Sequence, residues 1–231
     1  MTFVRDSGKE VTETKIDLKK PHDLLVPYTQ TMFASYLFRP KQEDVLIVGL
    51  GGGAMVHFLQ HYDPSVNVDA VEIDPVVVQI AEEYFGTRSS ERTRIITEDA
   101  FRFLRETDRL YDVIYMDAFL KPSDDTDSTG VAMRLKTIEF YRNVQRRLKP
   151  DGLVVFNLNS HRGLSDDIET IRRAFANTYV FSVPGAGNTV VVSSTSREQL
   201  QPDSLASVAK DLDGRFAANF SFQSTLGNLT R

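Results

Sequence analysis

Glycines and carboxylates stand where successive strands of this chain are predicted to end. Four glycines follow the apolar run Val45–Val48, namely Gly49, Gly51, Gly52 and Gly53. Glu72 ends a second apolar run about twenty residues further on, which is the spacing of a ribose-binding carboxylate in a nucleotide-binding unit. Glycine lets the backbone approach a ligand closely, because no Cβ stands in the way. The spacing therefore predicts a site for a nucleoside-bearing cofactor.

Three more predicted strands end in side chains that can bind or react. Asp99 follows the third strand, Asp117 is the last residue of the fourth and Asn157 lies at the end of the fifth. Ligands of open α/β sheets bind at the carboxyl ends of the strands, so Asp99 is a candidate partner of the exocyclic amine of adenine and Asp117 a candidate active-site group. The alternative is that such acids only cap the following helices. That explanation suits Asp74, because a proline follows it.

The alternation of apolar runs and helical patterns predicts the fold. Near-continuous apolar strands separated by helices are typical of a parallel sheet that helices cover on both faces. Two β-rich runs, Tyr179–Val183 and Thr189–Ser194, flank a short glycine turn and predict a hairpin. We therefore expect an α/β fold with a doubly wound, mostly parallel, seven-stranded sheet of class I methyltransferase type that ends in a C-terminal antiparallel hairpin.

The same patterns give boundaries. We expect a small N-terminal β element and a lead-in helix in residues 1–40. A Rossmann-like SAM-binding domain is expected over residues 41–195, and an extension packed on that domain over residues 196–231. The expected parallel strands are Val45–Val48, Val66–Ile73, Arg94–Thr97, Val113–Asp117 and Leu153–Leu158. The expected helices lie near Ala54–His61, Pro75–Phe85, Phe101–Glu106, Thr137–Leu148 and Ser165–Phe175.

Composition excludes several classes of function. The 231 residues are 41% hydrophobic and 26% charged, as in soluble globular proteins, and the net charge of −5 gives no support for a nucleic-acid partner. The absence of cysteine excludes disulfides, thiolate metal sites and a cysteine nucleophile. No apolar run approaches the length of a membrane span, and the N-terminus lacks the order of a signal peptide. We expect a cytoplasmic protein with no membrane partner.

The motifs at the strand ends resemble those of the spermidine synthase family. The resemblance extends over roughly residues 22–195. It is carried by Val45–Gly53, Ala70–Pro75, Asp99–Leu104, Tyr111–Phe119 and Leu135–Tyr141. Members of this family move an aminopropyl group from decarboxylated S-adenosylmethionine to a diamine, on a class I methyltransferase fold.

The resemblance implies roles for single residues. It implies that Glu72 holds the ribose and that Asp99 with Ala100 holds the adenine. It further implies that Gln30 contacts the nucleoside and that Asp117 faces the transfer site as the catalytic group.

The chain departs from the family pattern at three positions. Gly52 stands where the family's glycine loop carries an aspartate, Leu120 where a second acid grips the amine, and Thr29 where a tyrosine precedes the glutamine. Tyr28 is adjacent to that last position. The glycine loop Gly49–Gly53 together with Asp117–Phe119 looks more like the spermidine synthase-like branch of the family.

Three functions therefore remain open. The first is aminopropyl transfer from decarboxylated S-adenosylmethionine to a small amine. The second is methyl transfer from ordinary S-adenosylmethionine, because Gly52 leaves room for the methionine carboxylate at a helix N-terminus. The third is a nucleoside-binding module without catalysis. The resemblance also suggests a homodimer as a candidate assembly.

Other polar residues allow weaker hypotheses. The segment Lys121–Gly130 is polar enough to form a lid, and its acids Asp124, Asp125 and Asp127 can attract a polycation, although a solvated acidic loop is the preferred interpretation. His57 and His61 have helical i, i+4 spacing, but no third ligand is apparent, so we expect a surface pair and no metal. His161 follows the fifth strand and is a candidate general base.

Overall fold

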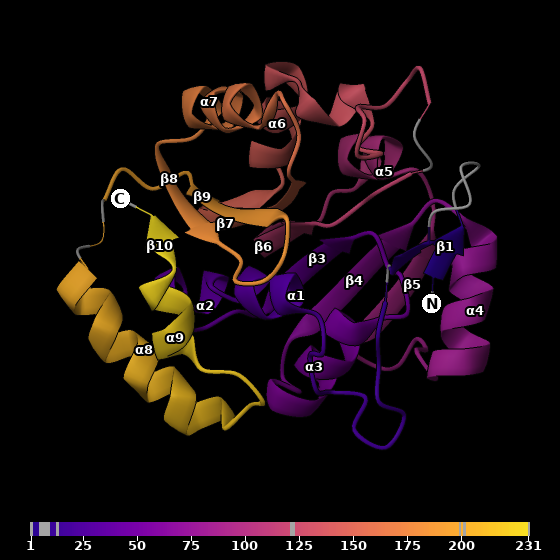
Figure 1. Cartoon of the computed structure of the whole chain (residues 1–231), viewed down its shortest axis with the longest axis horizontal. Helices are drawn as coiled ribbons and strands as arrows, with labels where there is room; N and C mark the ends of the chain where they lie inside the picture. The colour runs from indigo at the N-terminus through magenta and orange to yellow at the C-terminus, as the bar shows by residue number, and fades with distance from the viewer. Residues whose placement is uncertain are drawn as a thin grey trace.

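The main sheet has the expected parallel core. The computed structural model describes residues 2–4, 10–12, 14–120, 123–198, 200 and 202–230. Within them the sheet has eight strands in the order β10-β8-β9-β7-β6-β3-β4-β5 (Figure 1). These strands are β3 Asp44–Val48, β4 Asn67–Glu72, β5 Thr93–Thr97, β6 Tyr111–Met116, β7 Leu148–Asn159, β8 Asn177–Ser182, β9 Asn188–Ser194 and β10 Leu229–Thr230. Strands β3 to β7 pair in parallel, and β9 pairs antiparallel with both β7 and β8.

The predicted α/β architecture with its antiparallel hairpin is confirmed, and the sheet has one strand more than expected. Leu229 and Thr230 pair antiparallel with Phe181 and Val180 of β8. A strand of two residues carries no alternating pattern that a sequence could reveal. The expected N-terminal β element is a two-stranded antiparallel sheet, β1 Thr2–Val4 with β2 Glu10–Thr12.

The helices lie close to where the periodicity places them, but the helix expected over Thr137–Leu148 ends at Gln145, and Leu148 begins β7. Helix α4 has the bounds expected from the sequence, because Asp74 caps it, Pro75 begins it and Gly86 ends it in the left-handed conformation. The α-helices are α1 Pro27–Met32, α2 Ser35–Phe38, α3 Ala54–Tyr62, α4 Pro75–Phe85, α5 Ala100–Glu106, α6 Ile138–Gln145, α7 Leu164–Ala174, α8 Pro202–Phe216 and α9 Phe222–Gly227. None of these helices, within the described residues, has the length and apolar character needed to cross a membrane.

Two apolar layers hold the sheet between its helices. Alternate side chains of a strand point to opposite faces, so Val45 and Ile47 pack on one side of β3 while Leu46 and Val48 pack on the other. The first layer includes residues of α1, α2, α3, α8 and α9, and the second includes residues of α5, α6 and α7 (Figure 1). Both faces are covered, which explains why these strands are continuously apolar.

The C-terminal helices contribute to the first layer. Phe222 at the start of α9 is fully buried, and its ring lies 5.4 Å from that of Phe216 and 6.4 Å from that of Tyr36. Asp213 of α8 accepts a hydrogen bond of 2.8 Å from the Ser221 hydroxyl and so ties the two helices together.

Truncation of Phe222 tests this packing. We expect Phe222→Ala to lower the free energy of unfolding by about 3–5 kcal/mol, because it leaves a cavity among aromatic rings. Tyr84 is 66% exposed, so the control Tyr84→Ala should stay within about 0.5 kcal/mol of the wild type. Urea unfolding followed by circular dichroism measures both. Equal stabilities of the two variants would mean that α9 is not part of the cooperative core.

Candidate active site

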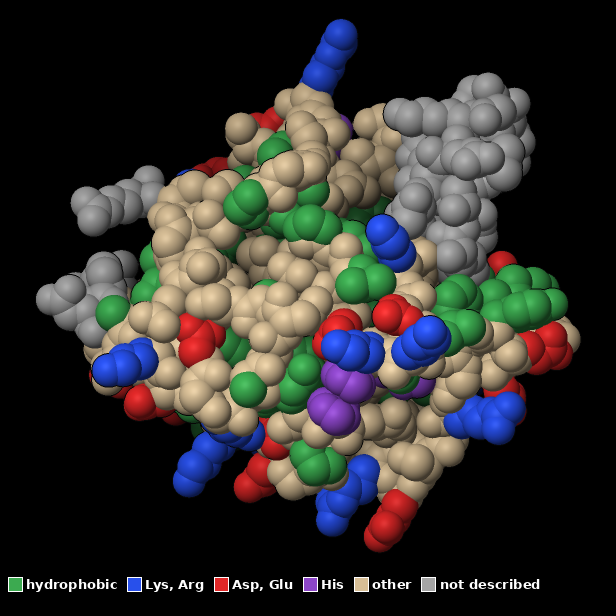
Figure 2. Space-filling model, turned by 60° about the horizontal axis from the view of Figure 1, so that its bottom comes forward, with side chains coloured by type: hydrophobic (Ala, Val, Ile, Leu, Met, Phe, Trp, Pro, Cys, Tyr) green, Lys and Arg blue, Asp and Glu red, His purple; other side chains and the backbone are tan. Residues whose placement is uncertain are grey.

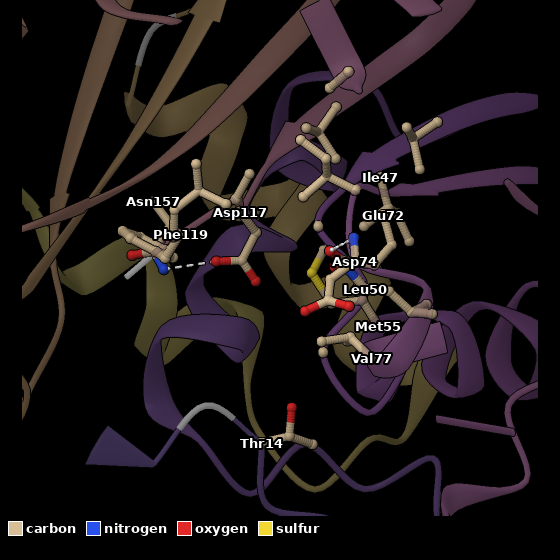
Figure 3. A pocket seen from close by; sticks show the side chains of 18 of the residues that line it. Thr14, Ile47, Leu50, Met55, Glu72, Asp74, Val77, Asp117, Phe119 and Asn157 are labelled. Atoms are coloured by element: carbon tan, nitrogen blue, oxygen red, sulfur yellow. Dashed lines mark hydrogen bonds between the residues drawn. The ribbon is translucent and has the colours of Figure 1, made fainter. Parts of the chain in front are cut away.

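A cavity of about 550 Å³ lies at the carboxyl ends of the parallel strands (Figure 3). Strand β3 has β4 as its neighbour on one side within the sheet and β6 on the other, so the strand order changes direction beside β3. Such a switch point is where open α/β sheets bind ligands, and the volume suits a small molecule. The cavity lining includes residues that follow β3, β4, β5 and β6 and residues at the end of β7.

The glycine loop is shaped by close contacts. Gly49 has a φ of 95°, and a Cβ there would lie 2.2 Å from the carbonyl oxygen of Asp117. Only glycine fits a position that combines this backbone conformation with so close a neighbour. Gly49, Gly51 and Gly53 line the cavity, as expected for a cofactor-binding loop.

Gly52 is absent from the cavity lining and packs against Thr14, which belongs to it. Its N–H donates a hydrogen bond of 2.8 Å to the Thr14 hydroxyl, and a Cβ at Gly52 would lie 2.6 Å from the Thr14 methyl group. The ring of Phe85 would lie 3.2 Å from the same Cβ. The space that the sequence suggested for a carboxylate is therefore occupied by Thr14 and Phe85.

Glu72 is held at the cavity by backbone donors. One carboxylate oxygen accepts a hydrogen bond of 3.0 Å from the N–H of Leu50, and the other accepts one of 3.0 Å from the N–H of Asp74. Each carboxylate oxygen has two lone pairs, so both can accept a further hydrogen bond from a ligand. The backbone thus orients the side chain that is predicted to hold a ribose.

Asp99 caps helix α5 and also forms an ion pair with Arg134. One oxygen accepts a hydrogen bond of 2.9 Å from the N–H of Phe101 at the start of α5, and the other accepts one of 2.7 Å from Arg134. Arg134 also lies 5.5 Å from the centre of the Phe101 ring and lines the cavity, as Ala100 does. Sequence reasoning missed Arg134, because nothing local links it to a carboxylate 35 positions away.

Asp117 lies across the cavity from Glu72 (Figure 3). The Asn157 amide donates a hydrogen bond of 2.8 Å to one oxygen of the Asp117 carboxylate, and the Tyr28 hydroxyl donates one of 3.3 Å to the other. Tyr28, rather than its neighbour Thr29, therefore brings a phenol to the site. The Thr29 hydroxyl donates instead to the carbonyl of Val26 at 2.7 Å.

Gln30 is not brought together with the other predicted residues. Its amide donates a hydrogen bond of 2.6 Å to the carbonyl of Leu24, and the residue is absent from the lining of the cavity. In this structure it ties α1 to the preceding turn. A contact between Gln30 and the nucleoside stays a prediction.

The histidines of α3 have hydrogen-bonding and stacking partners within the protein. His57 lies 3.0 Å from the Phe85 carbonyl and 2.9 Å from the Thr87 hydroxyl, and burial lowers its pKa. The ring of His61 stacks on His22 at 3.7 Å, and Figure 2 shows histidines together on the surface. Neither α3 histidine belongs to a cluster of three or more ligands within the described chain.

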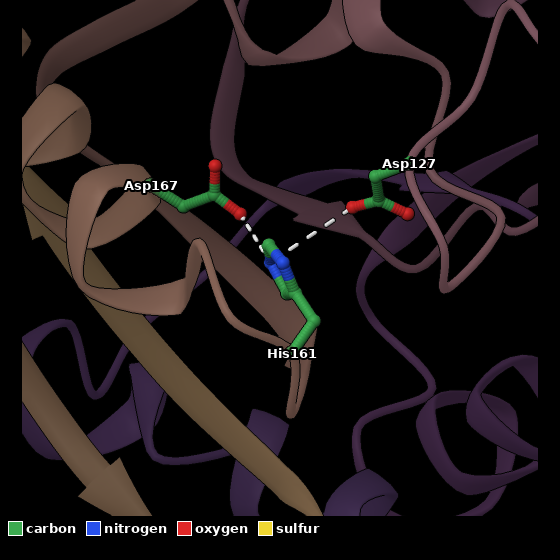
Figure 4. Close-up of side chains that lie close together, drawn as sticks. All are labelled: Asp127, His161 and Asp167. Atoms are coloured by element: carbon green, nitrogen blue, oxygen red, sulfur yellow. Dashed lines mark hydrogen bonds and ion pairs between the residues drawn. The ribbon is translucent and has the colours of Figure 1, made fainter.

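The acids of the segment after β6 have different surroundings. Asp124 and Asp125 are exposed, whereas Asp127 pairs with Lys136, which also lies 2.5 Å from Asp167. His161 joins this cluster, 2.8 Å from Asp167 and 3.9 Å from Asp127 (Figure 4). His161 does not line the cavity, so its predicted role as a base is not supported by its position. Lys121 and Pro122 lie outside the described residues.

Comparisons with known proteins show the family of this chain. A family model described as the spermine/spermidine synthase domain matches residues 27–203. The chain belongs to this family. It is 34% identical to a polyamine aminopropyltransferase of Vibrio vulnificus over 198 residues, which cover 84% of this chain and 64% of that protein. The chain thus spans less than two thirds of the Vibrio relative.

Solved structures confirm the fold that this family uses. Human methyltransferase-like protein 13 in complex with SAH is 24% identical, with a TM-score of 0.76 over 85% of this chain and 95% of that one. A probable spermidine synthase of Corynebacterium glutamicum is 20% identical, with a TM-score of 0.69 over 92% of this chain and 82% of that one. The methyltransferase fold predicted from the sequence is therefore confirmed.

The cluster around Asp127 predicts a pH dependence of stability. Burial alone would raise the pKa of Asp127, but hydrogen bonds from Lys136, Thr129 and the N–H of Val131 outweigh it and lower the pKa from 3.8 to about 2. A depressed carboxyl pKa stabilises the folded state above the unfolded-state value, and this stabilisation is lost as the pH falls from about 4 to about 2.

We therefore expect Asp127→Asn to unfold more easily than the wild type by about 2 kcal/mol at neutral pH, with a gap that closes below pH ~4. The exposed Asp124 of the same segment gives the control Asp124→Asn, which should match the wild type at each pH. Urea unfolding across this pH range measures the three proteins. A gap that does not change with pH would exclude an ionised Asp127 as its cause.

Proposed function

We propose that this protein transfers an aminopropyl group from decarboxylated S-adenosylmethionine to a small amine. The observation that carries the proposal is the pair of oriented carboxylates on opposite sides of one cavity, Glu72 on the β4 side and Asp117 on the β6 side. Membership of the spermine/spermidine synthase family supports the same reaction.

The donor would lie along the glycine loop. Glu72 would accept hydrogen bonds from the ribose hydroxyls, because its oxygens are already fixed by two backbone N–H groups. Asp99 and Ala100 would border the adenine. Because Arg134 binds one oxygen of Asp99, the exocyclic amine would have to share or displace that guanidinium. Arg134 is half exposed, so an exchange of this kind costs little.

The transfer is a direct displacement at the carbon next to the sulfonium. The amine nitrogen forms a bond to that carbon, the carbon–sulfur bond breaks, and the electron pair leaves with methylthioadenosine. The amine must attack in its neutral form and in line with the leaving sulfur. Asp117 would accept the proton that the nitrogen loses, or orient the nitrogen, while Tyr28 and Asn157 fix the carboxylate.

One observation favours a second candidate, methyl transfer from intact S-adenosylmethionine. Gly52 offers no room for a methionine carboxylate, but Lys15 lines the cavity. An ammonium at that place would attract the carboxylate that distinguishes the two donors. Calorimetry with S-adenosylmethionine, its decarboxylated form and methylthioadenosine separates the candidates. Absence of binding for all three would leave a module without catalysis.

Assembly and location complete the proposal. The resemblance to the family suggests a homodimer that acts in the cytoplasm on small molecules. Light scattering during size-exclusion chromatography would measure the mass in solution.

Glu72 tests the donor site. We expect Glu72→Ala to weaken binding of the adenosyl donor thirty- to hundredfold, about 2–3 kcal/mol, because a charged pair of hydrogen bonds is lost. Glu91 is exposed and does not line the cavity, so Glu91→Ala is the matched control and should bind as the wild type does. Calorimetry measures affinity, and circular dichroism checks folding. Unchanged affinity in folded Glu72→Ala would place the ribose elsewhere.

Asp117 tests the transfer site. We expect Asp117→Asn to keep donor affinity within a few-fold of wild type but to lower turnover about a hundredfold or more, the range of a positioned acid or base. Release of methylthioadenosine measures turnover, with Asp124→Asn as the control of equal charge change. A parallel loss of affinity and turnover would instead assign Asp117 to donor binding.

A further inference from the structure

The two ends of the cavity differ in charge. Among the described residues that line it, the carboxylates are Glu72, Asp74, Glu98, Asp99 and Asp117. Four of these follow β4 and β5, on the side where the donor is proposed to lie. Asp117 is the sole carboxylate of the described lining on the side of β6 and β7. An acceptor on that side therefore meets one described acid.

A chain of three hydrogen-bonded asparagines leads away from this acid. Asn188 of β9 donates through Nδ2 to Oδ1 of Asn157 at 2.9 Å and to Oδ1 of Asn159 at 2.7 Å. Asn157 in turn donates to Asp117 at 2.8 Å. Because each amide has a distinct donor and acceptor end, this chain fixes the orientation of all three asparagines.

The chain leaves one donor and one acceptor for a ligand. Within the described part of the protein, Asn159 Nδ2 and Asn188 Oδ1 take part in no hydrogen bond, and both residues line the cavity half-buried. Phe119 and Leu120 line the same side with apolar surface. A neutral group that both donates and accepts, such as a hydroxyl, matches this pair of amide atoms. A second ammonium finds no carboxylate among them.

We propose that the acceptor is an amine with a single ionisable nitrogen and a neutral hydrogen-bonding group at its far end, an amino alcohol rather than a diamine. Asn159 and Asn188 are its specificity-determining residues. This inference rests on the aminopropyl transfer proposed above. In that reaction the nitrogen beside Asp117 is alkylated, and the distal hydroxyl binds Asn159 and Asn188 and does not react.

Competition between matched acceptors tests the inference. With decarboxylated S-adenosylmethionine as donor, the intact chain is assayed with aminobutanol, putrescine and butylamine, which share a four-carbon skeleton. We expect kcat/KM for aminobutanol to exceed that for putrescine about tenfold or more, because the distal ammonium of putrescine would be left without a charged partner. A kcat/KM for putrescine equal to or above that for aminobutanol overturns the inference, as does a kcat/KM for butylamine equal to that for aminobutanol.

A near-isosteric substitution tests the assigned residues. Asn159→Asp keeps the oxygen that accepts from Asn188 and replaces the free amide donor with a second carboxylate oxygen. We expect it to shift the ratio of kcat/KM values toward putrescine by about tenfold or more. Asn143 of α6 lies outside the cavity lining, so Asn143→Asp adds the same charge elsewhere and should not shift the ratio. Equal ratios in the two folded variants overturn the assignment.

Donor calorimetry keeps this inference separate from the proposed function. If the wild type binds no adenosyl donor, the proposed function fails and the inference fails with it. If it binds the decarboxylated donor but prefers putrescine, or uses none of the three amines, only the acceptor assignment is overturned.

Discussion

The contact between the glycine loop and the end of β6 determines the shape of the site. The Asp117 N–H donates to the Val48 carbonyl at 2.9 Å, and the Gly49 N–H donates to the Val71 carbonyl at 2.8 Å. These bonds continue the parallel pairing beyond the strands and bring the Asp117 backbone against Gly49. A Cβ at Gly49 would separate β3 from β6. The distance between the glycine loop and Asp117 thus depends on the absence of a Cβ at Gly49.

The acids around the cavity are supported by the backbone before any ligand arrives. Asp74 and Asp99 each accept an N–H at the start of a helix, and Glu72 accepts two N–H groups from its own loop region. Capping and ligand binding are therefore compatible uses of one carboxylate, because each oxygen can accept more than one hydrogen bond. Asp99 can therefore cap α5 and still accept a hydrogen bond from a ligand.

Local signals explain what the sequence predicted. Helix α4 was predicted at both ends because its cap, proline and terminal glycine are all local to it, and the strands were predicted because burial on both faces makes them apolar. The alternation of strands and helices then predicted that Glu72 and Asp117 lie together at the carboxyl ends of the strands.

Contacts between distant segments escaped prediction. Thr14 reaches Gly52 from 38 residues away and Arg134 reaches Asp99 from 35. Asn188 of β9 reaches Asn157 of the neighbouring strand β7 from 31 residues away. Such pairs depend on loop conformation and on side-chain rotamers, which leave no periodic pattern. The family motif aligns its tyrosine with Thr29, but the phenol that reaches Asp117 is that of Tyr28. An alignment counts positions, whereas the site depends on where a side chain can reach.

The close packing of Thr14 on Gly52 makes the side chain allowed at position 52 depend on the residue at position 14. An aspartate at position 52, as in the family's common loop, would place its side chain in the volume of the Thr14 methyl group and the Phe85 ring. A single codon change there would therefore damage the loop before it could add a charge. An aspartate at position 52 would fit only with a smaller residue at position 14 or a rearranged N-terminal segment.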